Sequence, residues 1–176
     1  KSRAFLDSMD NSLLLGRASQ WKLDETSGIS ASDSWLTNTG ALTNFADTSS
    51  GYGDAHDSGW MSTTNCISGT CLRFDGVDDY INCGNNSSLN FADKKMTIST
   101  WIKTEDIDGW QQLINKGWSS NGAHLLALYN SGATLQMRNS DGTLYSTTYS
   151  NIIIINYWYN IVGVYDDFDK TLKIYV

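Results

Sequence analysis

The side chains best placed for chemistry lie in one short segment, residues 71–83, which reads Cys-Leu-Arg-Phe-Asp-Gly-Val-Asp-Asp-Tyr-Ile-Asn-Cys. Leu72 and Phe74 alternate with polar neighbours, so the first half predicts a strand with one buried face. The turn that follows places three carboxylates around a glycine, and they belong to Asp75, Asp78 and Asp79. Carboxylate oxygens can hold a cation, but a solvated turn has the same composition. Both interpretations stay open.

Catalytic chemistry has little support in the sequence. Hydrolysis of a glycosidic bond needs two carboxylates flanking it, roughly 5 to 9 Å apart. The chain has only two glutamates, Glu25 and Glu105, and no strand places both on one face. The two histidines, His56 and His124, lack metal-ligand spacing and a nearby Ser or Cys in a recognisable nucleophile setting. We therefore expect a protein that is not an enzyme.

Tryptophans in loops indicate binding instead. A sugar site typically packs an aromatic ring against the apolar side of the sugar, with amides and carboxylates for its hydroxyls. Four tryptophans stand beside Gly, Ser or Asn in expected loops: Trp35, Trp60, Trp110 and Trp118. Each of them could also fold back as a lid on the core. The sequence predicts an exposed aromatic platform without saying which ring forms it.

The charge balance restricts the partners. Nineteen acidic residues stand against twelve basic ones, for a formal net charge of −7 with no basic cluster. Such a chain repels a phosphate backbone, so we expect no nucleic-acid partner. No stretch reaches the roughly 18 apolar residues of a membrane span.

Two of the three cysteines flank a short Ser-Gly turn. Cys66 and Cys71 can form a disulfide across a hairpin if their Cα atoms lie about 5.5 Å apart. Zinc is the competing ligand, but no Cys-x-x-Cys pair or histidine partner lies nearby. A disulfide favours an oxidising, extracellular location. Cys83 would then be a small hydrophobic residue rather than a reactive thiol.

The pattern of the chain is that of an all-β protein. At 176 residues it suits one domain, and from residue 96 short strands recur with turn residues between them. Residues 24–70 read as a long loop with one short strand near 41–45, and Ile152–Ile155 as a run buried on both sides. The expected strands cover residues 21–23, 72–74, 80–81, 96–103, 113–116, 124–129, 135–138, 144–148, 158–165 and 172–176.

One helix is expected, at the start of the chain. Phe5, Leu6, Met9 and Leu13 follow the spacing of a single helix face, and Gly16 can end the helix. The helix would either pack on the β-domain or be the end of a longer one. In the second case residues 1–16 resemble the helical stem of type IV pilin-like proteins.

The segment Leu72–Ile81 resembles the strand pair typical of laminin-G-like, concanavalin-A-like jelly-roll domains. Segments 21–28, 31–34, 96–103 and 158–165 are similar to other strands and loops of that family, so the resemblance covers about residues 20–176. It implies a two-sheet antiparallel jelly-roll sandwich. It also implies a structural calcium ion at Asp33 and Asn38, although both residues could equally cap turns with their side chains.

The family continues through a turn into closing strands, whereas this chain ends within the pattern at Lys173–Val176. We expect either further closing strands or another chain that covers this edge. The function expected from the resemblance is an extracellular recognition or adhesion module that binds carbohydrate or a surface glycoprotein. The alternative is a structural, pilin-like subunit whose sandwich decorates a cell-surface filament.

Overall fold

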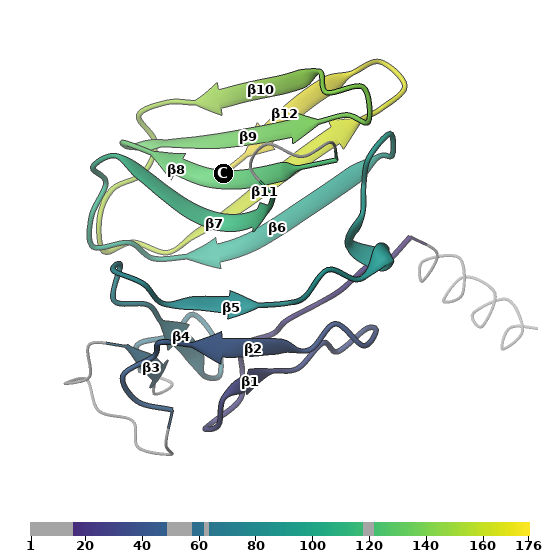
Figure 1. Cartoon of the computed structure of the whole chain (residues 1–176). Helices are drawn as coiled ribbons and strands as arrows, with labels where there is room; N and C mark the ends of the chain where they lie inside the picture. Colours follow the sequence, from purple (N-terminus) through teal and green to yellow (C-terminus); the bar gives the residue numbers. More distant parts are fainter. Residues whose placement is uncertain (1–15, 49–57, 62–63, 118–121) are drawn as a thin grey trace, which may run out of the picture. The chain divides into compact units, whose positions relative to one another are not determined.

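The computed structural model describes residues 16–48, 58–61, 64–117 and 122–176 (Figure 1). Regular structure among them is almost entirely β, and every pairing between named strands is antiparallel. The predicted all-β class is therefore confirmed. The chain forms two compact units, residues 1–89 and 90–176. The expected helix falls on residues 1–15, which lie outside the described residues.

The first unit contains a three-stranded sheet in the order β1-β2-β5 and a separate pair of β3 with β4. The predicted strand at 21–23 is reduced to one bridge between Trp21 and Asp33, because Leu23 adopts a positive φ of 55° that interrupts an extended chain. The elements are β1 (Ser30–Ala31), β2 (Gly40–Thr43), β3 (Gly59–Met61), β4 (Cys71–Arg73), β5 (Tyr80–Asn82) and the 3-10 turn η1 (Ser87–Leu89).

A disulfide closes the chain beside the β3–β4 pair. Cys66 and Cys71 are bonded, with their Cα atoms 5.6 Å apart, as the sequence predicts. Cys71 lies opposite Met61 in the β3–β4 register. The disulfide and the pairing of β3 with β4 therefore both constrain the position of Cys71. Cys83 is a half-buried free thiol, and burial raises its pKa to about 11. It therefore stays protonated near neutral pH.

The second unit is a two-sheet sandwich. One sheet has the order β10-β9-β8-β7 and the other β12-β11-β6. Hydrophobic residues from both sheets form one core between them. The strands are β6 (Met96–Ile102), β7 (Trp110–Lys116), β8 (His124–Tyr129), β9 (Gly132–Arg138), β10 (Leu144–Tyr149), β11 (Tyr159–Asp166) and β12 (Thr171–Tyr175).

The core of this unit follows from the alternation of its strands, in which every second side chain points inward. Met96 and Ile98 of β6 meet Leu126 of β8 and Leu135 of β9 in that core. Gly163 of β11 permits a close approach of the sheets, since a Cβ there would lie 2.9 Å from a methyl carbon of Leu135. The remaining fully buried core residues are Leu128, Ala133, Met137, Ile161 and Tyr165.

The prediction for Ile152–Ile155 was wrong. This run is a connection between β10 and β11, in which Ile153 is buried but Ile154 is 61% exposed and Ile155 is also exposed. The backbone N–H groups of Ile152 and Ile153 both donate to the carbonyl of Ser131, which bends the segment instead of extending it. A run of branched apolar residues is therefore compatible with a loop when turn hydrogen bonds decide its path.

Strand β12 pairs with β11 and has no second partner among the described strands. The expectation that another strand or chain covers its outer edge stays a prediction. The assignment of residues 20–176 to one sandwich also stays a prediction.

Candidate functional site

The outward-facing side of the sheet β10-β9-β8-β7 is the main candidate surface. Leu126, Leu128, Leu135 and Met137 point into the core, so the alternate positions of these strands point away from it. Directly opposed residues of antiparallel strands share a face. The resulting set, here called the outer face, consists of Trp110, Gln112, Asn115, Leu125, Ala127, Tyr129, Thr134, Gln136, Arg138, Leu144, Ser146 and Thr148. Its central members Leu125, Ala127 and Thr134 are buried, so its accessible part lies mainly on the edge strands β7 and β10 and at the ends of β8 and β9.

Hydroxyls and amides dominate the polar part of the outer face. The hydroxyls of Thr134 and Thr148 lie 2.9 Å apart, and Asn115 donates through Nδ2 to Oε1 of Gln112 at 2.7 Å. None of the twelve residues is acidic, and Arg138 is the one charged member. The exposed polar members, Gln112, Asn115, Ser146 and Thr148, can exchange hydrogen bonds with sugar hydroxyls, but the set lacks the carboxylate pair needed for glycoside hydrolysis.

An aromatic pair lies at one end of the outer face. Trp110 and Tyr129 are opposed in the register of β7 and β8, and their ring centroids lie 4.7 Å apart at a tilt of 35°. The two side chains are 48% and 44% exposed. Neighbouring backbone is braced, because Asn130 donates its N–H to the Gly109 carbonyl and accepts the Gly109 N–H on Oδ1. The pair thus offers a fixed apolar surface to solvent.

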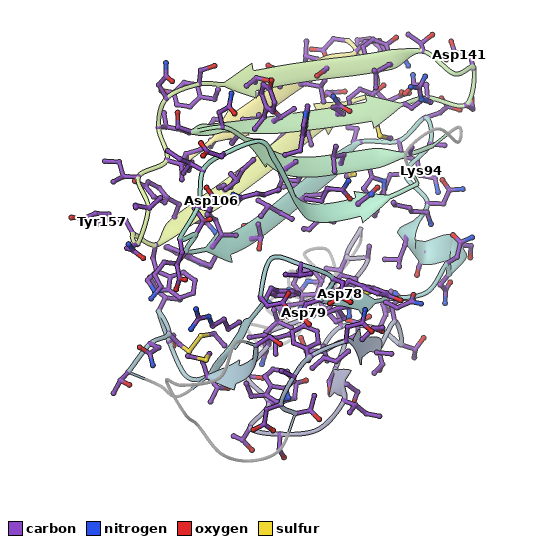
Figure 2. The ribbon with its side chains drawn as sticks, turned by 60° about the vertical axis from the view of Figure 1, so that its left-hand side comes forward. Asp78, Asp79, Lys94, Asp106, Asp141 and Tyr157 are labelled. Atoms are coloured by element: carbon purple, nitrogen blue, oxygen red, sulfur yellow. A yellow bond between two sulfur atoms is a disulfide. The ribbon has the colours of Figure 1, made fainter. Side chains whose placement is uncertain are left out.

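The two ends of the second unit differ in character (Figure 2). Asp106 and Tyr157 lie near the end where β7, β9 and β11 begin, which is also the end of the Trp110–Tyr129 pair. Lys94 and Asp141 lie at the opposite end. Arg138, the last residue of β9, belongs to that opposite end. The aromatic and the cationic members of the outer face are therefore separated along the strands.

The other predicted tryptophans are placed differently. Trp60 is only 3% exposed and donates its indole N–H to the Gly28 carbonyl at 2.8 Å, so it forms part of the interior and offers no platform. Trp35 is exposed, but the Arg17 guanidinium lies 4.8 Å from its ring centroid. Trp118 lies outside the described part of the chain. Among the predicted rings described, only Trp110 combines exposure with a stacked aromatic partner.

The sequence reasoning missed Tyr129. It ends β8 immediately before the turn at residues 130–131, and the alternation from Leu125 through Ala127 places it on the outer face. The available sequence signal was a tyrosine at the end of a strand, at a position that alternation directs away from the core. Its proximity to Trp110 depends on the pairing of β7 with β8, which no local pattern contains.

Asp33 accepts hydrogen bonds on both carboxylate oxygens. Oδ1 accepts the backbone N–H groups of Gln20 and Trp35, and Oδ2 accepts the N–H of Asn38 and the hydroxyl of Ser19. Desolvation raises the pKa of Asp33, but the backbone N–H donors outweigh it and hold the pKa well below the usual range. The carboxylate therefore caps the turn as an anion.

Asn38 is buried beside Asp33 and forms hydrogen bonds with several segments of the first unit. Its Nδ2 donates to Oγ of Ser19 at 2.7 Å, its Oδ1 accepts from Ser88, and its carbonyl accepts the indole N–H of Trp21. These bonds correspond to the turn-capping alternative for Asp33 and Asn38. Calcium at these two residues stays a prediction.

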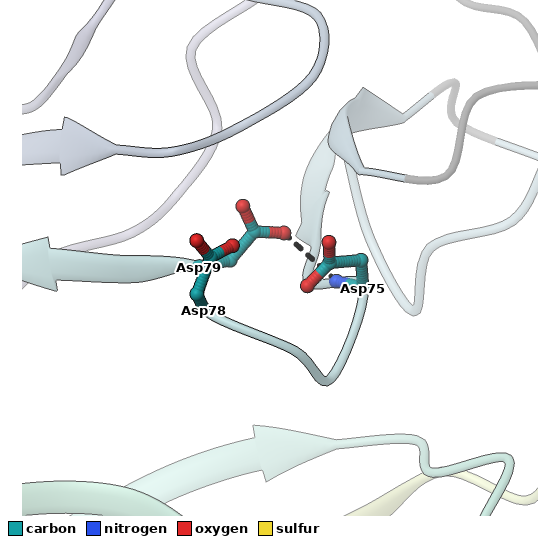
Figure 3. A group of neighbouring side chains, drawn as sticks. All are labelled: Asp75, Asp78 and Asp79. Atoms are coloured by element: carbon teal, nitrogen blue, oxygen red, sulfur yellow. Dashed lines mark hydrogen bonds between the residues drawn. The ribbon is translucent and has the colours of Figure 1, made fainter.

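The carboxylates of Asp75, Asp78 and Asp79 converge in the turn between β4 and β5 (Figure 3). One oxygen from each lies within 4.8 Å of the others. Oδ2 of Asp79 accepts the N–H of Asp75 at 2.8 Å, whereas Oδ1 of Asp79 is buried without a hydrogen-bond partner. A buried acceptor without a donor and two neighbouring carboxylates fit an oxygen-preferring cation such as calcium.

The histidines and glutamates form no catalytic arrangement among the described residues. His124 is 6% exposed and packs against Phe91 at a ring-centroid distance of 5.5 Å. Its burial lowers its pKa to about 4, so it is neutral at physiological pH. Glu25 accepts the N–H of Ser32 at 2.6 Å. His56 lies outside the described residues.

Residues 75–176 match the family model described as the Concanavalin A-like lectin/glucanases superfamily, of the laminin G type. The chain belongs to this superfamily. Laminin G-like domains of this kind are typically carbohydrate-binding or adhesion modules and are generally non-catalytic. No curated protein and no solved structure gives a significant match to the chain. Within the described residues, no helix has the length and hydropathy to cross a membrane.

Proposed function

We propose that this laminin G-like protein is a non-catalytic recognition module that binds carbohydrate on the outer face of β7–β10. The observation that carries the proposal is the exposed Trp110–Tyr129 pair at one end of a polar face without acidic residues. The rings supply apolar contact for a sugar ring, and the hydroxyls and amides of the strands exchange hydrogen bonds with sugar hydroxyls. A glycan on a surface glycoprotein presents the same chemistry.

The composition of the same face explains why the proposed module would bind a sugar without hydrolysing it. A retaining or inverting glycosidase needs two carboxyl groups flanking the bond. A sugar lying on the outer face would contact amides, hydroxyls and aromatic rings, with no acid beneath it to protonate the leaving group. The Cys66–Cys71 disulfide supports an extracellular place of action, since disulfides persist in oxidising compartments.

The proposal is tested by glycan-array binding of the full chain with two matched variants, Trp110→Ala and Trp101→Ala. Trp101 is 52% exposed but lies on β6 in the other sheet, so it controls for the loss of an exposed indole. We expect Trp110→Ala to weaken binding about tenfold or more, because the ring supplies most of the apolar contact, and Trp101→Ala to bind like the wild type.

Equal binding by all three proteins would exclude the outer face as the site. An absence of glycan binding by the wild type would exclude the recognition role and favour the pilin-like structural subunit. That alternative rests on residues 1–16, nearly all of which lie outside the described residues.

We further propose that Asp75, Asp78 and Asp79 hold a structural calcium ion. Calcium should then raise the melting temperature relative to EDTA, because a ligand at 100 times its Kd stabilises a folded protein by about 2.7 kcal/mol. Asp79→Asn should abolish that shift, whereas Asp141→Asn, which alters a carboxylate in the second unit, should preserve it. A calcium-dependent shift that survives Asp79→Asn would assign the ion elsewhere, with Asp33 and Asn38 as the next residues to substitute.

A further inference from the structure

Three acidic residues lie in the chain just before the Trp110–Tyr129 pair. Glu105, Asp106 and Asp108 belong to the connection between β6 and β7, and all three are exposed. Asp108 is two residues before Trp110, so their Cα atoms lie at most about 7 Å apart, and Asp106 is at most about 14 Å away. Carboxylates therefore lie beside the aromatic pair, although none belongs to the outer face.

Hydrogen bonds hold this connection in place. Oδ1 of Asp106 accepts the N–H of Asp108 at 2.9 Å, and the carbonyl of Asp106 accepts Nε2 of Gln111 at 2.7 Å. Asn130, which follows the tyrosine of the pair, exchanges two hydrogen bonds with Gly109. The acidic connection and the two rings are therefore fixed next to each other.

Basic side chains do little to offset these acids. Among the described residues, no ion pair is recorded for Asp106 or Asp108, and the recorded ion pairs lie at the opposite end of the second unit. Lys103 is the one base at this end of β6, and its Nζ lies 5.7 Å from the ring centroid of Trp158. Lys116 lies at the far end of β7, roughly 20 Å from the aromatic pair, which exceeds the Debye length of about 8 Å at physiological salt. The electrostatic potential at the pair is therefore negative.

The two kinds of group favour the same charge on a ligand. An aromatic ring attracts a cation that lies within about 6 Å of its centroid, because its face is the negative end of a quadrupole. The carboxylates attract the same cation at longer range. A sugar with an amine gains from both interactions, whereas a sugar with a carboxylate is repelled by both.

We propose that the Trp110–Tyr129 pair binds a sugar that carries a free, protonated amine, such as glucosamine. This inference rests on the proposed function, because it names the class of sugar that the same aromatic pair selects. The site accepts one or two sugar units at this end of the sheet, since Ala127 and Thr134, further along the central strands, are buried. Gln112, the next exposed outer-face residue of β7, supplies an amide for the sugar hydroxyls.

The experiment compares two disaccharides that differ only at C2: cellobiose, which has hydroxyls there, and β-1,4-linked glucosamine disaccharide, which has amines. Each is titrated into the full chain at low salt and pH 6, where an amine of this kind is protonated. Binding is followed through the indole N–H resonance of Trp110 by nuclear magnetic resonance.

Three proteins are compared: the wild type, Asp106→Asn/Asp108→Asn, and the control Asp141→Asn/Asp169→Asn. Asp141 and Asp169 are exposed and lie at the end of the second unit opposite Asp106, so the control makes the same change in net charge elsewhere (Figure 2). Asparagine keeps an oxygen that accepts hydrogen bonds, so both double variants preserve the acceptors of their turns.

We expect the wild type and the control to bind the glucosamine disaccharide about fivefold more tightly than cellobiose. Each of the two carboxylates contributes up to about twofold at low salt, and the cation–π contact contributes a similar factor. Asp106→Asn/Asp108→Asn should retain only about a twofold preference, and 0.5 M NaCl should reduce the preference of the wild type similarly. Equal affinities of the wild type for the two disaccharides, or a fivefold preference that survives in this variant, would overturn the inference.

The outcomes separate this inference from the proposed function. If cellobiose binds as tightly as the glucosamine disaccharide, the recognition role stands and only the preference for an amine is overturned. An unshifted Trp110 resonance with the glucosamine disaccharide overturns the inference even if neutral glycans bind on the array. Ethanolamine that binds as tightly as the glucosamine disaccharide would overturn the assignment to a sugar, because the sugar ring would then contribute nothing.

Discussion

The two faces of the sheet β10-β9-β8-β7 are built from the same strands and have opposite roles. The inner face consists of fully buried residues such as Leu126, Leu128 and Leu135. The outer face carries hydroxyls, amides, the exposed Trp110–Tyr129 pair and one arginine. On the edge strands β7 and β10 the outer-face positions are exposed, whereas on the central strands Leu125, Ala127 and Thr134 of the same face are buried. Substitutions on the inner face should change stability, and those at exposed outer-face positions should change binding.

Truncation of a core leucine should have the largest effect on stability. Leu126→Ala removes a fully buried side chain, and we expect a loss of about 2 to 5 kcal/mol in the free energy of unfolding. Leu144→Ala, an exposed leucine of the outer face, should cost less than about 1 kcal/mol. Urea denaturation measures both, and similar losses for the two variants would contradict the assignment of faces.

The inner face should also respond to pH through His124. Its pKa is about 4 when folded, against an ordinary value near 6.5, because burial disfavours the charged ring. Between these values the unfolded chain binds the proton more tightly. Stability should therefore fall by about 3 kcal/mol as the pH drops from about 6.5 to about 4, with no further loss from this group below that.

The measurement is urea unfolding of the wild type and His124→Phe at pH 7, 5.5 and 4.5. The difference between the two proteins isolates the histidine from carboxylates that titrate nearby. A difference that stays constant across this range would show that His124 keeps its ordinary pKa in the fold.

The Trp110→Ala substitution tests the other half of the comparison, because it should affect binding more than stability. The ring is half-exposed and lies at the first residue of β7, so we expect less than about 1.5 kcal/mol of lost stability alongside the tenfold loss of glycan affinity. Thermal melts of the same preparations used for binding provide the check. A loss of several kcal/mol would instead place the tryptophan among the residues that hold the sandwich together.

The smallest expected effect concerns the hydrogen bond on the outer face between the hydroxyls of Thr134, which is buried, and Thr148, which is exposed. Thr134 is buried and its hydroxyl lies 2.9 Å from that of Thr148. Thr134→Val should cost about 1 kcal/mol, and adding Thr148→Val should cost little more, because the bond is already lost. Additive costs in this double-mutant cycle would show that the two hydroxyls do not interact.

Much of the second unit could be predicted from sequence because its signals are local. Met96 and Ile98 alternate with polar residues and form β6, and the turn at 139–142 joins β9 to β10 as expected. The Cys66–Cys71 disulfide followed from a short turn between two cysteines. These features depend on residues close in the chain, so their patterns are complete within a few positions.

The wrong predictions concern residues whose environment depends on partners far away in the chain. Ile154 and Ile155 are exposed although their run is apolar, since hydrogen bonds to Ser131 across the sheet end direct the preceding backbone. Trp60 and Trp110 both follow a glycine, yet one is buried beside the Gly28 carbonyl and the other is exposed beside Tyr129. Both tryptophans follow a glycine, and a residue distant in the chain determines whether each ring is buried or exposed.

The sequence by itself determined the all-β class, the strands of the second unit and the disulfide, because each depends on alternation, turn residues or spacing along the chain. Only the tertiary structure decided which aromatic rings form a surface and which carboxylates converge. Exposure and hydrogen-bond satisfaction depend on strand register and on segments far apart in sequence. For that reason the outer face appears only when β7, β8, β9 and β10 are paired.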